Sequence, residues 1–266
     1  MTGVIFMISS KKVFAIIMGA GKGTRIGAVD RPKVMFEVAG KPIIGWAIEP
    51  FWQLKKEGLI DRIITVIGFH GNQIIDYLGE KSEYVWQKEQ LGTGHAVKQA
   101  ENLIADEDGL TLITNGDHAL YTKETYRKII QRVAEKSLTL GFGVVKSQTR
   151  FSSYGRVIRD KEGKVAGIIE VPEATEEQKK ISERNPNLFV ADNKWLFGVL
   201  PKIKASSVKG EYYIVDIVKF AIDEGKPVEA IEIENEDEAL GINTHEDREE
   251  TEKILKARHS TLLFSA

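Results

Sequence analysis

The stretch "IIMGAGKGTR", residues 16–25, joins a short apolar run to a loop of three glycines and two cations. The run at 13–18 is continuous and is bounded by glycine, which is typical of a strand buried on both faces. Glycines let backbone N–H groups approach an anion closely, and Lys22 and Arg25 add positive charge. The stretch therefore predicts a buried parallel strand that leads into a polyphosphate-binding loop.

The spacing of the glycines narrows the choice of ligand. Gly19, Gly21 and Gly23 match neither the P-loop nor the Gly-x-Gly-x-x-Gly pattern of dinucleotide-binding proteins. Kinase-type phosphate binding and NAD binding are therefore disfavoured. The structural alternative is a glycine turn with solvated cations, since loop glycines have many uses.

Short apolar runs alternate with amphipathic stretches through the first half of the chain. Expected strands after 13–18 are 62–69, 84–87 and 110–114, and expected helices are 41–58, 72–79, 94–105 and 123–136. Pro50 should kink or end the helix at 41–58. The alternation predicts a doubly wound, mostly parallel α/β sheet, whose ligand lies beyond the carboxyl ends of the strands.

The pattern changes after Leu138. Residues 156–170 form two β-like runs around a charged Lys-Glu-Gly-Lys turn, which predicts a small antiparallel hairpin on the sheet. The elements expected after it are a polar helix at 175–183, a strand at 187–192, a helix at 212–225, a strand at 228–233 and a charged helix at 244–259. Since no linker or repeat divides the chain, we expect one domain at 13–266 after a short extension at 1–12.

Composition excludes several classes of partner. The 266 residues carry a net charge of −2, which gives no field to attract nucleic acid, and no segment is apolar enough to cross a bilayer. The chain has no cysteine and its first residues lack a basic leader, so we expect no disulfide, no signal peptide and a cytoplasmic location.

Several motifs together resemble those of a known family. "GAGKGTR" followed by "RPKVMFEVAGKPII" resembles the signature of the sugar-phosphate nucleotidyltransferases. The stretches "QKEQLGTGHAV", "GDHAL", "YGRVIRDKEGKVAGIIE", "GEYYIVDIV" and "EALGINTHED" are similar, in the same order, to the pyrophosphorylase half of the bacterial N-acetylglucosamine-1-phosphate uridylyltransferases. The matched stretches run from about Ala15 to Asp247.

The resemblance implies a magnesium-dependent enzyme of nucleotide-sugar biosynthesis that supplies cell-wall precursors. Its substrates would be UTP and a sugar 1-phosphate, in the first place N-acetylglucosamine 1-phosphate, and its products a UDP-sugar and pyrophosphate. The chain ends in "LLFSA" without the hexapeptide repeats of an acetyltransferase β-helix, so acetylation is not expected.

The resemblance also assigns residues on the nucleotide side. Arg25 and Lys33 take the places of the family's phosphate-binding arginine and lysine, and Gln87 would read the edge of the pyrimidine. Residues that would hold the triphosphate, the base and the ribose through backbone contacts are Ala20, Gly21, Lys22, Gly23, Gly92 and Thr93. For "LGTG" the alternative is an ordinary capped turn at the start of a helix.

Asp117 and Asn243 are the metal ligands that the resemblance implies. Asp117 follows the strand at 110–114, at the same sheet edge as the glycine loop. Hard oxygen ligands suit Mg²⁺, and few protein contacts suffice for it. The alternative for Asp117 is a helix cap or a turn.

Four residues would contact the sugar. The resemblance gives Gly155 a backbone contact, Glu170 a grip on sugar hydroxyls, Asn185 an amide contact and Tyr213 a ring against the sugar. Their structural alternatives are a hairpin position, an exposed strand end, a turn and a core residue, respectively. Neither His95 nor His118 is given catalytic work, because a sugar phosphate is already ionised and needs no base.

The chain departs from these look-alikes near the acceptor. It has Asn185-Pro186-Asn187 where they read Asn-Thr-Gly, Val215 where they usually carry a hydroxyl, and His118-Ala119 after the metal-ligating Asp. The departures predict an altered acceptor site. Two alternatives stay open, namely the same reaction with another sugar phosphate or nucleotide, and a non-catalytic sensor of nucleotides or sugar phosphates.

Overall fold

The computed structural model describes residues 11–264. The expected extension at 1–12 lies outside the described residues except for Lys11 and Lys12, and Lys12 already begins the first strand. No helix in the described part of the chain combines the length and apolarity that a bilayer crossing requires.

A parallel sheet forms the first half of the protein, as predicted. Its strands lie in the order β5 (Glu83–Trp86), β4 (Arg62–Ile67), β1 (Lys12–Met18) and β6 (Gly109–Asn115), all parallel. The carboxyl ends of β1, β4 and β6 therefore meet at one edge, which places the glycine loop beside the residues that follow β6.

The second half extends the same sheet with mixed strand directions. β11 (Phe189–Asp192) runs antiparallel between β6 and β7 (Leu140–Lys146), while β12 (Val228–Glu232) pairs parallel with β7. The end of β7 also pairs with β10 (Glu183–Asn185), followed by β8 (Gly155–Arg159) and β9 (Val165–Ile169). β8 and β9 are the antiparallel hairpin expected at 156–170.

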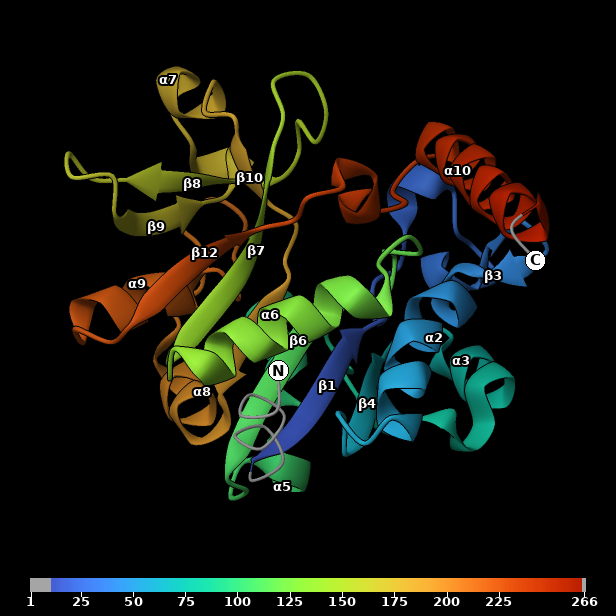
Figure 1. Ribbon diagram of the computed structural model, residues 1–266, viewed down its shortest axis with the longest axis horizontal. Coiled ribbons are helices and arrows are strands. Elements are labelled where there is room, and N and C mark those ends of the chain that lie inside the picture. Colours follow the sequence, from blue (N-terminus) through green and yellow to red (C-terminus); the bar gives the residue numbers. More distant parts are fainter. Residues whose placement is uncertain (1–10, 265–266) are drawn as a thin grey trace.

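Alternate residues of β1 belong to two separate hydrophobic clusters, one on each face of the sheet. On one face lie α2 (Ile43–Lys56), α3 (Gly71–Leu78), α6 (Lys123–Glu135) and α10 (His245–Phe264). On the other lie α4 (Thr93–Lys98), α5 (Glu101–Ile104), α8 (Asn193–Val199) and α9 (Asp216–Asp223). Figure 1 shows α6 crossing the sheet, with α2 beside it and α3 on the far side of α2. The predicted doubly wound α/β architecture is therefore confirmed.

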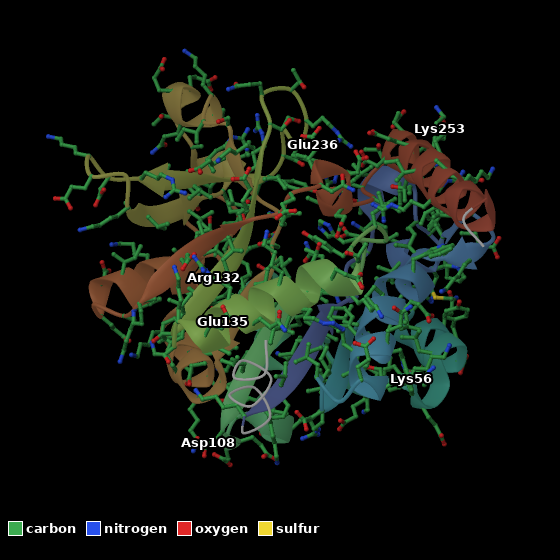
Figure 2. The ribbon with its side chains drawn as sticks, in the orientation of Figure 1. Lys56, Asp108, Arg132, Glu135, Glu236 and Lys253 are labelled. Atoms are coloured by element: carbon green, nitrogen blue, oxygen red, sulfur yellow. The ribbon has the colours of Figure 1, made fainter. Side chains whose placement is uncertain are left out.

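Short elements complete the chain. They are the hairpin β2 (Glu37–Val38) and β3 (Lys41–Pro42), helix α7 (Glu176–Lys179) and the 3₁₀ turns η1 (Thr24–Ile26), η2 (Lys33–Met35), η3 (Gly79–Lys81), η4 (Val171–Glu173), η5 (Leu200–Lys202) and η6 (Glu236–Ala239). Charged side chains such as Lys56, Asp108 and Lys253 point outward around the periphery (Figure 2).

Four of the expected helices differ from the structure. The helix expected at 175–183 ends at Lys179, and Glu183 belongs to β10. α2 runs through Pro50, so the alternative that this proline ends the helix is wrong; its ring is buried with the apolar face of the helix. The single helix expected at 94–105 divides into α4 and α5, because the backbone turns to i→i+3 bonds at Gln99 and Ala100. α9 begins at Asp216 rather than at 212, because the backbone at 212–214 forms hydrogen bonds with the loop at 91–94.

Candidate active site

A cleft opens at the carboxyl edge of the parallel strands. It has two adjoining compartments, a first of about 390 Å³ and a second of about 650 Å³. The residues that line both compartments are Arg25, Asn115, Asp117, Glu170, Asn187, Glu211, Tyr213 and Asn243. Every predicted site residue lines this cleft except Lys22 and Gly23, so the fold brings together residues from along the whole chain.

The glycine loop enters the first compartment directly from β1. Ala20 and Gly21 line this compartment, and a Cβ built on Gly21 would meet no atom within 4 Å. Gly23 has a φ of +73°, and its Cβ would lie 2.5 Å from the Cβ of Lys33, so only glycine fits there. Among residues 11–264, no backbone carbonyl accepts a hydrogen bond from the N–H groups at 20–23. The loop therefore offers free donors beside the cleft.

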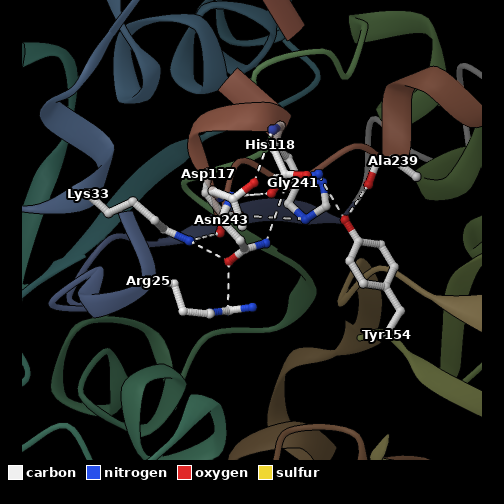
Figure 3. Close-up of polar contacts among 10 residues, drawn as sticks. Arg25, Lys33, Asp117, His118, Tyr154, Ala239, Gly241 and Asn243 are labelled. Carbon is white, nitrogen blue, oxygen red and sulfur yellow. Dashed lines mark hydrogen bonds and ion pairs between the residues drawn. The ribbon is translucent and has the colours of Figure 1, made fainter. Parts of the chain in front are cut away.

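Four polar side chains meet at the centre of the cleft (Figure 3). Lys33 donates to Asp117 Oδ2 and, at 2.9 Å, to Asn243 Oδ1. Arg25 donates to the same Asn243 oxygen, also at 2.9 Å. Burial raises the pKa of Asp117, but the Lys33 ammonium and His118 outweigh it and hold this pKa below its usual value. Asp117 is therefore an ionised carboxylate that pairs with Lys33.

Asp117 and Asn243 fit a divalent cation by their donor atoms. Asp117 Oδ1 is buried and has no hydrogen-bond partner in the described part of the chain, while Asp117 Oδ2 and Asn243 Oδ1 both accept from Lys33 (Figure 3). One carboxylate and one amide oxygen, with substrate oxygens, suit Mg²⁺. Within residues 11–264 no group of three or more His, Cys, Asp or Glu forms an all-protein metal cage. Whether these two side chains bind Mg²⁺ stays a prediction.

His118 lies behind Asp117 rather than in a position for acid–base work. Its Nε2 is 3.6 Å from Asp117 Oδ1, and its ring stacks on Tyr121. Burial lowers the pKa of His118, so the ring is neutral near pH 7. Tyr154 lies next to it, donating to the Ala239 carbonyl at 2.7 Å and accepting from the Gly241 N–H at 2.8 Å.

The predicted base-binding loop is fixed to the segment that precedes α9. Gly92 has a φ of +106°, and a Cβ there would lie 2.6 Å from the Tyr212 carbonyl oxygen. The Gly94 N–H donates to that oxygen, and the Ile214 N–H donates to the Thr93 hydroxyl. We call these contacts between 91–94 and 212–214 the loop clamp.

Gln87 is buried at the floor of the first compartment. Its amide nitrogen donates to the Gly92 carbonyl at 2.9 Å and lies 3.2 Å from His95 Nδ1. These contacts fix the orientation of the side chain, and His95 acts here as a neighbour of Gln87.

Carboxylates line the second compartment around Glu170. Burial raises the pKa of Glu170 to about 7, and Asp216, Glu173 and Glu211 add to the shift. Burial also raises the pKa of Asp216 to about 6. This side of the cleft therefore presents the carboxyl group of Glu170, whose charge changes near neutral pH.

The other residues predicted to contact the sugar also line the second compartment, and one of them, Asn185, has a structural role as well. Gly155 and Tyr213 both face it. The Asn185 amide donates to the Gly143 carbonyl at 3.0 Å, and its oxygen accepts from the Asn187 N–H at 3.1 Å. Asn185 thus holds the turn at 185–187, in addition to lining the compartment.

The residues at which this chain differs from the family that it resembles do not all line the cleft. His118, Pro186 and Asn187 line the second compartment. Val215 is 2% exposed within a core cluster and does not line the cleft, so the expectation that it faces the acceptor is wrong. Position 215 follows the loop clamp, and its side chain turns into the apolar layer under α9.

Sequence reasoning did not single out several residues that line the cleft, among them Gln90, Asn115, Tyr154 and Glu211. All four lie within or directly beside the motifs quoted above, so nearness to a motif was the signal that could have found them.

Comparisons with known proteins show which family the chain is similar to. The family described as "Nucleotidyl transferase" matches residues 14–254. Proteins named "Bifunctional protein GlmU" are 36% identical in Oceanobacillus iheyensis and 37% identical in Enterococcus faecalis, in each case over 92% of this chain. Each match covers 52% of the relative, so the chain spans about half the length of the curated relatives it matches.

A solved structure shares the fold. The structure described as UDP-glucose pyrophosphorylase complexed with UDP-glucose superposes with a TM-score of 0.71, covering 93% of this chain and 99% of the other. At 16% identity this likeness concerns the fold alone.

Proposed function

Because the chain belongs to the nucleotidyl transferase family, we propose that it transfers a uridylyl group from UTP to a hexose 1-phosphate and releases pyrophosphate. N-acetylglucosamine 1-phosphate is the acceptor that the sequence resemblance implies. The product would be a UDP-sugar, made in the cytoplasm for nucleotide-sugar biosynthesis.

The glycine loop is the observation that carries this proposal. Its free N–H groups at 20–23 lie beside Arg25 and Lys33 at the carboxyl edge of the parallel strands. Free backbone donors together with cations favour a polyphosphate over a neutral ligand. The first compartment would hold the nucleotide, with Gln87 at the base, and the second would hold the sugar.

The proposed reaction needs positioning and neutralised charge. An oxygen of the sugar 1-phosphate attacks the α-phosphorus of UTP in line, and pyrophosphate leaves on the opposite side. Both reactants are anionic, so Arg25, Lys33 and the loop N–H groups would hold their oxygens and offset the repulsion. Mg²⁺, held by Asp117 and Asn243, would supply further neutralisation of phosphate oxygens. No covalent enzyme intermediate is required.

Pyrophosphate release is the measurement that tests this function. UTP, CTP, ATP, GTP and dTTP would each be combined with N-acetylglucosamine, glucose and glucosamine 1-phosphates, with Mg²⁺ and with EDTA. We expect turnover with UTP that EDTA abolishes. Nucleotide binding without release from any pair would instead indicate a sensor.

Two arginines offer a matched comparison within the same loop region. Arg25→Ala should lower kcat/KM for UTP by about 10²–10³-fold, as when one preorganised donor is removed. Arg31 does not line the cleft and pairs with Asp30, so Arg31→Ala should leave kcat/KM unchanged. Equal effects of both changes would show that Arg25 acts only through general surface charge.

A further inference from the structure

Asn187 lies at the junction of the two compartments. It follows Pro186 in the turn at 185–187 and lines both the first and the second compartment. Its φ is +57°, in the left-handed region that asparagine and glycine adopt with least strain. The Asn185 side chain accepts from its N–H and fixes its backbone.

The side-chain oxygen of Asn187 is buried without a partner. Among the residues that the structure describes, no donor reaches Asn187 Oδ1 within hydrogen-bond distance. An unpaired buried acceptor is costly, and native proteins satisfy nearly all such groups. Asn187 lines the cleft, so a ligand there that presents a hydrogen-bond donor to this side chain would satisfy the oxygen.

The backbone alone does not require asparagine at this position. Glycine adopts a φ of +57° at no steric cost, and glycine stands here in the enzymes that the sequence resembles. Compared with glycine, asparagine therefore places a polar side chain in the cleft and makes the cleft narrower at this point.

The position of Asn187 identifies the part of the acceptor that it would meet. Asp117 and Asn243 line the same junction, where the reacting phosphates would lie. In a hexose 1-phosphate, C2 is the neighbour of the phosphate-bearing carbon that carries a variable group, either a hydroxyl, an ammonium or an acetamido group. The carboxyl groups of Glu170 and Glu211 also border the junction, so the protein oxygens there mainly accept hydrogen bonds.

We infer that Asn187 is a specificity-determining residue that contacts the C2 substituent of the acceptor sugar. Its amide oxygen accepts a hydrogen bond from a C2 hydroxyl or ammonium group, and its volume takes space that an acetamido group needs. This inference rests on the proposed function and names the acceptor class within it. Glucose 1-phosphate and glucosamine 1-phosphate then compete well with N-acetylglucosamine 1-phosphate.

Asn187→Gly tests the inference without straining the turn. The ratio of kcat/KM for N-acetylglucosamine 1-phosphate to that for glucose 1-phosphate would be measured at saturating UTP. We expect the variant to raise this ratio by about tenfold or more, within the range that single pocket contacts supply. The KM for UTP should stay within about twofold, because the loop and Gln87 are untouched.

Two further variants keep the result interpretable. Asn187→Asp retains the volume and an oxygen acceptor, so it should keep a low ratio for the acetamido sugar and gain with glucosamine 1-phosphate. Ser137 also has a positive φ, 50°, and does not line the cleft, so Ser137→Gly controls for glycine substitution and should leave the ratio unchanged.

The outcomes separate this inference from the function on which it rests. An unchanged acceptor ratio in Asn187→Gly, with an active wild type, overturns the role of Asn187 and leaves the function standing. No turnover with any acceptor overturns the proposed function. Calorimetric titration with glucose 1-phosphate then decides the role of Asn187 separately: weaker binding by Asn187→Gly supports the contact, and equal binding overturns it.

Discussion

The carboxylate of Asp117 stays ionised although the protein buries it. Its pKa is held down by Lys33, which also donates to Asn243, so one ammonium group links the two proposed metal ligands. The resemblance to the uridylyltransferases implied that Asp117 and Asn243 act together. The shared contact to Lys33 could not be predicted, because it depends on how η2 approaches the end of β6.

Replacing this carboxylate tests the proposed metal site. Asp117→Asn should lower kcat by orders of magnitude, because a neutral amide binds Mg²⁺ poorly. Steady-state kinetics with Mg²⁺ measure the effect, and circular dichroism confirms that the fold survives. Asp108, at the periphery in Figure 2, pairs with Lys194 and provides the control Asp108→Asn, which should keep wild-type turnover. Normal turnover in Asp117→Asn would remove this residue from the metal site.

Among the elements, β7 is a strand that sequence patterns missed, and it carries glycines for reasons of packing. β7 includes Gly141 and Gly143, and a Cβ at Gly141 would lie 2.4 Å from the Val133 side chain of α6. At Gly143 a Cβ would lie 2.9 Å from Ile233. In the sequence these glycines resemble turn residues. Their true cause, the close approach of a helix and a neighbouring chain segment, is visible only in three dimensions.

Two glycines of the cleft should respond differently to alanine. Gly92 in the loop clamp has no room for a Cβ, whereas Gly21 has open space around it. Gly92→Ala should lower the melting temperature by at least about 2 °C, through strain at its positive φ. Gly21→Ala should keep the melting temperature and raise the KM for UTP, since the added methyl group enters the proposed triphosphate site. Differential scanning fluorimetry and UTP titrations distinguish these effects, and equal losses of stability in both variants would contradict them.

The carboxyl groups between β9 and α9 predict a dependence of stability on pH. The pKa of Glu170 is about 7 in the folded protein against an ordinary 4.5, through burial and then the neighbours Asp216, Glu173 and Glu211, with Arg156 opposing. Between these values the folded protein keeps a proton that the unfolded chain releases. The free energy of unfolding therefore falls as pH rises through this window, and stays lower above it.

Glu170→Gln removes this contribution. The melting temperature of the variant minus that of the wild type should increase by about 2 °C or more between about pH 5 and about pH 8. Thermal unfolding at several pH values measures the difference. Asp216, with a pKa of about 6, contributes in the same direction, so Asp216→Asn is the companion variant. A difference that stays constant with pH would show that Glu170 does not hold a proton in the folded protein.

At the scale of the whole molecule, the cleft collects residues from the first strand to the segment before the last helix. Sequence patterns predicted the parallel half and the hairpin because period and turn chemistry are local properties. They did not predict that β7 pairs on one edge with both β11 and β10, since that pairing joins segments far apart in the chain. The cleft depends on this strand pairing, which brings Glu170 and Asn187 to the same cleft as Asp117.

A ligand held by residues so far apart in the chain should bind only the folded protein. UTP with Mg²⁺ at about 100 times its dissociation constant should add about 2.7 kcal/mol to the free energy of unfolding. At about 2–4 °C per kcal/mol for a chain of this size, the melting temperature should rise by about 5–10 °C. EDTA should remove part of this rise, and Asp117→Asn should lose the same part, because the proposed Mg²⁺ would link the triphosphate to the end of β6. ATP should give a smaller rise, since the role we propose for Gln87 is to bind the edge of a pyrimidine. The rise in melting temperature could instead stay the same when EDTA is added, when ATP replaces UTP and when Asp117 is replaced by Asn. That result would show that the nucleotide binds by charge alone, without the proposed metal and base contacts.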